Sequence, residues 1–349
     1  MTTKASGAGT VPSFGADDVD VHAVTDYLDA HGLLPDDATI SAERLTGGVS
    51  AEVVAVRIEA ADGTRNWVIK RALPQLRVAS TWVATPQRAI VEARAMDVGA
   101  RVLPGQVPDV VYVDPVAFVT IQQRADPALT DWRASLLGGA TAKDVETARA
   151  LGTALATLHA ATVDRDKLSA FTDLSALVQL RIDPFHRTAA AALPEAAPRL
   201  NELAQELLHR PLCLVHGDFT PKNVLADGAR LQVLDWEVAH VGNPVFDVAL
   251  LLAHFVCKAV HRPGSAGGYV ECARLFHQHY LAGVDPALRP DDHLVAAHLA
   301  AFVLARTDGK SPAAYLTDDQ IRIARARALR WLGDPSVLPT DIWNELTDA

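Results

Sequence analysis

The stretch Leu214–Glu237, LVHGDFTPKNVLADGARLQVLDWE, constrains this chain more than any other part of it. Asp218 lies in its first polar segment, Asn223 follows five positions later, and Asp235 comes directly after the next apolar run. The short apolar runs on either side of Asp227-Gly228 are typical of two strands joined by a hairpin turn. The three polar side chains therefore fall at strand ends and in the connecting loop, and we expect them to lie close together.

These three side chains are the groups that a phosphoryl transfer to an alcohol requires. A carboxylate at Asp218 can receive or orient a hydroxyl proton, whereas the Asn223 amide and the Asp235 carboxylate are hard oxygen ligands that suit Mg²⁺. Protein kinases use the same order, an H-R-D-x-x-x-x-N loop followed by a metal-binding Asp. Asp and Asn are also common turn formers, but the joint spacing favours a catalytic loop. We expect His216 to orient this loop by a hydrogen bond rather than to bind a metal.

A glycine-containing turn upstream is a candidate phosphate-covering loop. Gly47, Gly48 and Ser50 lie between two stretches, Ile40–Leu45 and Ala51–Ile58, that are expected to be strands. A glycine pair between strands is often only a turn, and this one lacks the full G-x-G-x-x-G pattern. Its position ahead of a lysine-bearing strand favours the phosphate-covering role.

That strand ends in a lysine, and a helix with a buried acid follows it. The run Asn66–Lys70 has the form of a V-A-I-K strand, so Lys70 could reach nucleotide phosphates. Thr85-Pro86 predicts the start of a helix that continues to about Val98. Glu92 lies among apolar residues of this helix, and Lys70 is its expected partner because a buried carboxylate needs one.

A change of pattern near residue 123 predicts the boundary between two lobes. Val107–Tyr112 and Val116–Gln122 are expected to form an antiparallel pair, and the alternation is lost at Gln123–Pro127. We interpret this last segment as a hinge whose backbone would hold the adenine ring of a nucleotide. The candidate positions are Ile121, Gln122 and Gln123. The expected divisions are a flexible tail at 1–16, a nucleotide-binding lobe at 17–123, and a catalytic and substrate-binding lobe at 124–349.

The second lobe is expected to be mostly helical. Thr141 begins a predicted helix that ends near His159, and residues 174–210 read as helical stretches interrupted at Asp183-Pro184 and Leu193-Pro194. Asn243-Pro244 begins another helix, in which Asp247 either favours the helix N-terminus or bonds the catalytic loop and holds it rigid. Further helices are expected around 269–281, 293–305 and 318–332.

Composition excludes several other classes of protein. The 349 residues carry a net charge of −10, which does not support binding to nucleic acid or to an anionic membrane. Three separated cysteines indicate neither a disulfide framework nor a zinc site, and no run of about 18 apolar residues predicts a membrane span. We therefore expect a cytoplasmic enzyme; the oligomeric state is left open.

The segments LVHGDFTPKNVL and LDWEVAHVGNPVFDVALLL resemble the aminoglycoside phosphotransferase and choline kinase superfamily, which also includes methylthioribose kinase and homoserine kinase. The resemblance covers about Leu45 to Leu332, and Asp235 is followed by Trp-Glu rather than by the Phe-Gly of protein kinases. It implies an α+β, two-lobed protein-kinase-like fold, with a small antiparallel sheet in one lobe and helices in the other. It also implies ATP and Mg²⁺ as cofactors, although hinge contacts would also accept GTP. Asp218 would be the catalytic base, with Asn223 and Asp235 holding the metal.

The acceptor is expected to be a small hydroxylated molecule. Its binding site should lie on the second-lobe side of Asp218, walled by Thr130–Gly139 and by Ala305–Leu316, where Arg306 and Lys310 could meet an anionic or polyhydroxy substrate or form a solvated helix end. The candidate substrate contacts are Trp132, Arg133, Glu237 and Arg306. The W-R-x-x-L-L-x-G stretch at 132–139 looks closer to methylthioribose kinases, which favours a sugar-like metabolite. An antibiotic phosphotransferase and an ATP-binding regulatory pseudokinase are the alternatives.

Overall fold

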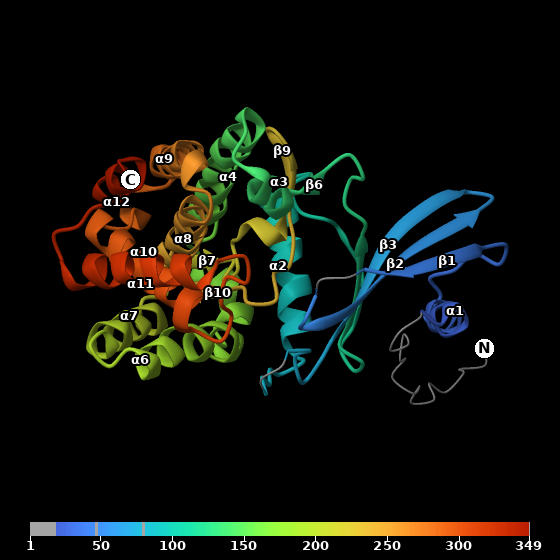
Figure 1. The fold of residues 1–349 in the computed structure, drawn as a ribbon. Helices are drawn as coiled ribbons and strands as arrows, with labels where there is room; N and C mark the ends of the chain where they lie inside the picture. Colours follow the sequence, from blue (N-terminus) through green and yellow to red (C-terminus); the bar gives the residue numbers. More distant parts are fainter. Residues whose placement is uncertain (1–18, 46–47, 79–80, 349) are drawn as a thin grey trace. The chain divides into compact units, whose positions relative to one another are not determined.

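The computed structural model describes residues 19–45, 48–78 and 81–348 (Figure 1). The chain forms two compact units. The first comprises the described residues up to Ala93 together with Asp109–Arg124, and the second comprises Arg94–Pro108 and Ala125 onward. The expected tail at 1–16 lies outside the described residues.

The first unit is built on one antiparallel sheet of five strands in the order β1-β2-β3-β5-β4. Its strands are β1 (Thr39–Arg44), β2 (Ala51–Ala60), β3 (Gly63–Ala72), β4 (Val110–Asp114) and β5 (Val119–Gln123). Alternate residues of β2, β3 and β5 are buried, and Val54, Ile58, Ile69 and Ile121 are completely buried in one core. Helix α1 (Val21–Ala30) adds Val24 and Leu28 to that core. The strands expected around the glycine turn and before Lys70 are therefore present.

Helix α2 (Arg88–Val102) begins later than the sequence predicted. The N–H groups of Arg88 and Ala89 bond back to the carbonyls of Thr85 and Pro86, so a turn precedes the helix. The helix then extends past Val98 and crosses from the first unit into the second. Its second half belongs with the second unit, where the aromatic ring of Trp236 packs closely against Gly99, so that a Cβ atom there would lie only 3.0 Å from the ring.

The second unit is mostly helical. Its two small sheets are β6 (Thr130–Asp131) with β8 (Val224–Asp227) and β9 (Arg230–Val233), and β7 (Cys213–Val215) with β10 (His240–Gly242). Its α-helices are α3 (Trp132–Gly138), α4 (Ala142–Ala161), α5 (Ser175–Leu177), α6 (Thr188–Ala192), α7 (Ala197–His209), α8 (Val245–His261), α9 (Ala266–Gly283), α10 (Asp292–Asp308), α11 (Asp318–Gly333) and α12 (Pro339–Thr347). Its 3₁₀ helices are η1 (Arg165–Phe171), η3 (Pro221–Asn223), η4 (Pro263–Ser265) and η5 (Pro286–Leu288).

Helix α8 lies inside this unit, and fifteen of its seventeen residues are buried. Helices α9, α10 and α11 pack around it (Figure 1). The capping box predicted at Thr141 is confirmed at the start of α4. Helices α3 and α12 were not predicted. No helix in the described part of the chain is both long and apolar enough to cross a membrane.

The expected interruption at Asp183-Pro184 was wrong. Residues Val178–Arg187 form a π-helix, η2, and Pro184 lies inside it. A π-helix bonds residue i to i+5, so the proline is accommodated by widening the helix instead of ending it. The carbonyl of Asp183 accepts a hydrogen bond from the Thr188 hydroxyl at 2.8 Å, five residues on. This widened helix carries a residue of the site described below.

Close packing of α4 against α9 depends on Gly152. A Cβ atom at this position would lie 2.3 Å from the Phe276 carbonyl oxygen. Gly152→Ala should therefore lower the free energy of unfolding by about 2 kcal/mol, because the helices must separate. Gly267→Ala on α9 is the control: its Cβ would meet no atom within 4 Å, and better helix propensity should make it neutral or stabilising by up to about 1 kcal/mol. Urea denaturation of both variants measures this, and equal stabilities would contradict the packing.

Candidate active site

The loop after β7 is anchored to the first turn of α8 by one carboxylate. Asp247 Oδ2 accepts a hydrogen bond from the backbone N–H of His216 at 2.7 Å, and Oδ1 accepts one from Gly217 at 2.9 Å. His159, on α4, lies 3.4 Å from the same carboxylate. Asp247 is completely buried. Of the two roles expected for Asp247, the structure shows that it bonds the loop that carries Asp218.

Gly217 allows the chain to turn sharply between His216 and Asp218. Its φ is +76°, and a Cβ atom would lie 2.4 Å from the Val238 carbonyl oxygen. Only glycine combines this backbone conformation with so close an approach. The turn directs the Asp218 side chain toward the cations that surround it.

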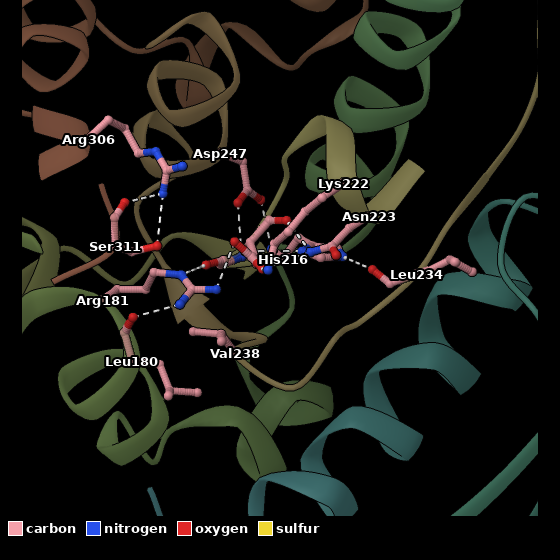
Figure 2. Close-up of polar contacts among 12 residues, drawn as sticks. Leu180, Arg181, His216, Lys222, Asn223, Leu234, Val238, Asp247, Arg306 and Ser311 are labelled. Atoms are coloured by element: carbon pink, nitrogen blue, oxygen red, sulfur yellow. Dashed lines mark hydrogen bonds and ion pairs between the residues drawn. The ribbon is translucent and has the colours of Figure 1, made fainter. Parts of the chain in front are cut away.

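Asp218 is a buried carboxylate with charged partners on both oxygens. Arg181 Nη2 lies 2.7 Å from Oδ1, and Lys222 Nζ lies 2.8 Å from Oδ2 (Figure 2). Asn223 Nδ2 also donates to Oδ2, at 2.8 Å. Burial opposes the charge, but Arg181 and then Lys222 hold the pKa of Asp218 far below its usual range. The carboxylate is therefore ionised at neutral pH.

His216 connects this loop to the strand pair beside it. Its Nδ1 accepts the Asp218 backbone N–H at 3.1 Å, and its Nε2 donates to the Leu234 carbonyl at 3.1 Å. Burial lowers the pKa of His216, although Asp247, Asp218 and Asp235 oppose the shift, so the ring is neutral. Both nitrogens bond backbone, which agrees with the predicted orienting role and makes His216 a positioning residue.

The two predicted metal ligands come from adjacent stretches of chain. The Leu234 N–H donates to the Asn223 carbonyl at 2.8 Å, which fixes Asp235 next to Asn223. Since Asn223 Nδ2 bonds both the backbone carbonyl and the carboxylate of Asp218, its amide oxygen is the group left for a metal. Asp235 has a φ of +65°, a conformation uncommon for residues other than glycine. Such strain is concentrated at functional sites.

One amide oxygen and one carboxylate fit Mg²⁺, which commonly takes one or two protein ligands and completes its shell with water and phosphate oxygens. No group of three or more His, Cys, Asp or Glu side chains in the described parts of the chain is arranged to hold a metal ion. A metal at Asn223 and Asp235 therefore needs oxygens from a bound nucleotide.

In the first unit, Lys70 and Glu92 are paired as predicted. Lys70 Nζ lies 2.5 Å from Glu92 Oε1, and both side chains are largely buried. Ser50 lies directly before β2, and its carbonyl accepts hydrogen bonds from the Arg88 guanidinium and the Leu73 N–H. Gly48 is exposed beside it. Gly47 lies outside the described residues.

The expected adenine-binding positions are only partly suited to that role. Strand β5 is flanked by β3 and β4, and Ile121 is completely buried between them. Ile121 and Gln122 pair with strands on both sides, so their backbone groups belong to the sheet, which corrects their assignment as nucleotide contacts. The Gln123 N–H donates to the Asp109 carbonyl at 2.8 Å. The backbone groups that could still contact an adenine ring are therefore those from Gln123 onward, apart from the Gln123 N–H.

The predicted substrate contacts separate into different environments. Trp132 is a core residue rather than a substrate contact, because its side chain is 2% exposed and its indole N–H donates to Asp144 at 3.0 Å. Arg133 is exposed and lies 3.3 Å from Asp131. Glu237 is buried two residues after Asp235. Arg306 binds the following loop, with Nη1 donating to the Ser311 hydroxyl at 2.9 Å (Figure 2).

Sequence reasoning missed two residues of the site, Arg181 and Lys222. Arg181 lies on the π-helix η2 and, besides its ion pair, donates through Nε to the Gly217 carbonyl at 2.9 Å. No motif marks it, because it reaches the loop from 37 positions away in the sequence. Lys222 lies within the motif, four residues after Asp218. A 3₁₀ turn at Pro221–Asn223 brings it back to the carboxylate, and this i,i+4 spacing was the available signal.

The loop after β7 holds an ionised Asp218 carboxylate beside Asn223, and comparison with known proteins shows the family to which the chain belongs. A model of the phosphotransferase enzyme family matches residues 41–267. This match covers more than half of the chain, and the chain belongs to that family. Membership confirms the resemblance recognised in the sequence and the prediction of a small-molecule kinase.

Individual relatives are distant. The methylthioribose kinase of Pectobacterium atrosepticum is 27% identical over 283 residues, which cover 72% of this chain and 68% of that protein. Methylthioribose kinase 1 of Oryza sativa is 26% identical over 265 residues, covering 64% of this chain and 60% of that protein, so the chain spans less than two thirds of its length. The solved choline kinase of Cryptosporidium parvum has a TM-score of 0.55 at 13% identity, over 87% of this chain and 93% of that one. The structural likeness confirms the predicted two-lobed α+β fold.

Removing the Asp247 carboxylate should destabilise the protein strongly. In Asp247→Ala the N–H groups of His216 and Gly217 lose their partner in a buried place, which should lower the free energy of unfolding by about 3 kcal/mol. Asp318→Ala removes an exposed acid from the first turn of α11 and should cost at most about 1 kcal/mol. Urea unfolding distinguishes the two, and similar losses would mean that Asp247 acts only on the helix N-terminus.

Proposed function

We propose that this protein transfers the γ-phosphoryl group of ATP to a hydroxyl of a small sugar-like or other hydroxylated metabolite. The observation that carries the proposal is the ionised Asp218 carboxylate, held between Arg181, Lys222 and Asn223. The similarity to methylthioribose kinases supports an acceptor of this kind. The reaction converts an alcohol and ATP into a phosphate ester, ADP and a proton.

The residues of the second unit would align and deprotonate the alcohol. Asp218 accepts the hydroxyl proton as the oxygen attacks the phosphorus atom, and the fixed loop keeps the carboxylate in line with it. A strongly acidic carboxyl is a weak base, so alignment contributes more than early proton removal, as expected for a loose transition state. Lys222, whose side chain is about half exposed, could meet a phosphate oxygen next to Asp218.

Each unit carries residues that we assign to nucleotide binding. Lys70, held by Glu92, would contact nucleotide phosphates, with Gly48 and Ser50 in the turn that covers them. Asn223 and Asp235 would hold Mg²⁺, which when bound neutralises charge on the phosphates.

The three cysteines are buried and unpaired, which fits a reducing compartment such as the cytoplasm.

Loss of either central carboxylate should abolish most activity while leaving the protein folded. Asp218→Ala and Asp235→Ala should each reduce phosphoryl transfer by about two orders of magnitude or more, since each removes a principal proton-accepting or electrostatic group. ADP release with MgATP and a panel of sugars, amino alcohols, aminoglycosides and macrolides measures this. Circular dichroism provides the folding control. Normal turnover by a folded Asp235→Ala protein would contradict the assignment of Asp235 as a metal-binding residue.

Arg181 should determine how the reaction depends on pH. In Arg181→Gln the pKa of Asp218 rises because its guanidinium partner is gone, so the carboxylate becomes protonated at higher pH than in the wild type. The acid limb of the kcat/KM profile should therefore move to higher pH, and the free energy of unfolding at pH 7 should fall by about 3 kcal/mol. Arg187→Gln, on the same helix but exposed and paired only with Asp183 in the described structure, should change neither quantity. An unmoved acid limb in Arg181→Gln would contradict this role.

A further inference from the structure

A second group of cations lies in the second unit, apart from those that contact Asp218. We call Lys258 of α8, Arg306 of α10 and Tyr315 of the following segment the cationic cluster. Lys258 is 1% exposed, and its Nζ lies 5.6 Å from the centre of the Tyr315 ring. Arg306 is oriented by Ser311, whose carbonyl and hydroxyl accept hydrogen bonds from Nη1.

The polar atoms of the cationic cluster are incompletely bonded. Within the described residues, Arg306 Nε and the Tyr315 hydroxyl are buried and have no hydrogen-bond partner. Lys258 has no hydrogen bond or ion pair there; its one specific contact is the Tyr315 ring. A cation over an aromatic ring gains about 2 kcal/mol at best, whereas burying an unpaired ammonium costs several. Folding alone therefore does not account for a lysine at this position.

The local charge is positive. Burial lowers the pKa of Lys258 to about 8, so the ammonium is still mostly protonated at pH 7. Arg306 and Arg133 act in the same direction as burial, while Cys257 and Asp131 oppose it. Asp131 is itself contacted by Arg133 at 3.3 Å. Two further cations therefore act on Lys258, and the carboxylate that opposes them, Asp131, is already paired with Arg133.

The cationic cluster lies on the Asp218 side of this unit. His254 precedes Lys258 by one turn of α8, and burial lowers its pKa well below the usual value. The charges of Lys258, Arg306 and Lys222 also lower this pKa, while the Asp218 carboxylate raises it. The pKa of His254 therefore depends both on the cationic cluster and on the charges around Asp218. In Figure 2, Arg306 and Ser311 lie in the same region as Arg181 and the loop that carries Lys222.

We propose that the cationic cluster binds an anionic group of the acceptor, a carboxylate or a phosphate ester, while a hydroxyl of the same molecule meets Asp218. Lys258 supplies the charge, and Arg306 Nε and the Tyr315 hydroxyl supply hydrogen bonds to the anionic oxygens. The inference rests on the proposed phosphotransferase function and narrows its acceptor to hydroxy acids, sugar acids or sugar phosphates. Cationic acceptors are disfavoured because the lysine and arginine would repel them.

Binding to the full-length protein tests the proposal without requiring turnover. Isothermal titration calorimetry, with Mg²⁺ and a non-hydrolysable ATP analogue present to fill the nucleotide site, compares matched acceptors that differ in the anionic group. The pairs are glycerate and glycerol, ribonate and ribitol, and ribose 5-phosphate and ribose, with choline as the cation. At least one anionic member should bind tenfold or more tightly than its neutral partner. Comparison of glycerate and ribonate with ribose 5-phosphate then shows whether the site binds a carboxylate or a phosphate ester.

Lys258→Met should remove this preference and leave a folded protein. The variant exchanges a buried unpaired charge for an apolar side chain of similar length, so its Tm should equal or exceed that of the wild type. A purely structural role for Lys258 predicts a lower Tm instead. Lys167→Met, at an exposed lysine that is paired with Asp164, should keep the preference. If no anion is preferred by the wild type, or if Lys258→Met retains the preference, the proposal is wrong.

Asp218→Asn separates this inference from the proposed function. It should bind the anionic acceptor as the wild type does but fail to release ADP. If the wild type releases ADP with neutral or cationic acceptors and shows no preference for anions, the phosphotransferase function stands and the anion site fails. If an anion binds through Lys258 but no acceptor stimulates ADP release, the anion site stands and the proposed function fails.

Discussion

The arrangement of the second unit depends on one buried carboxylate. Asp247 accepts the backbone N–H groups of His216 and Gly217, and thereby joins the first turn of α8 to the loop that carries Asp218. An isolated loop would not hold an uncommon backbone conformation, because few of its own contacts favour it. Here the loop is fixed from one side by Asp247 and from the other by His216, which donates to the Leu234 carbonyl. The strained Asp235 follows directly.

The second unit contains two buried charges with different surroundings, Asp218 and Lys258. Asp218 is fully compensated by Arg181, Lys222 and Asn223, so it remains ionised and rigid despite its burial. Lys258 has almost the same degree of burial but receives only an aromatic ring among the described residues. A compensated charge stabilises a geometry, whereas an uncompensated one is retained at a cost in stability. That contrast is why we assign Asp218 to the reacting hydroxyl and Lys258 to a charge carried by the ligand.

Residue spacing along the chain was enough to find the central motif and the Lys70–Glu92 pair. Both depend on short-range order: a spacing of five positions within one loop between strands, or a strand followed by a helix in the same unit. Arg181 could not be found in this way, since it approaches Asp218 from a π-helix that the sequence suggested would break at Pro184. The assignments of Ile121 and Trp132 failed for another reason. Local pattern does not reveal that a strand will have neighbours on both sides, or that an indole will bond Asp144.

The sequence by itself determined the class of protein, the motif residues and most helices and strands, because these follow from apolar periodicity and from the chemistry of side chains at fixed spacing. Only the tertiary structure decided which residues, distant in the sequence, become the partners of the buried charges. The partnership of Asp247 with the loop, of Arg181 with Asp218, and the lack of a described ionic partner for Lys258 depend on how α4, α8, α10 and η2 pack. Helix packing brings together residues that are far apart in the chain, and electrostatic energies depend on those distances and on the exclusion of water.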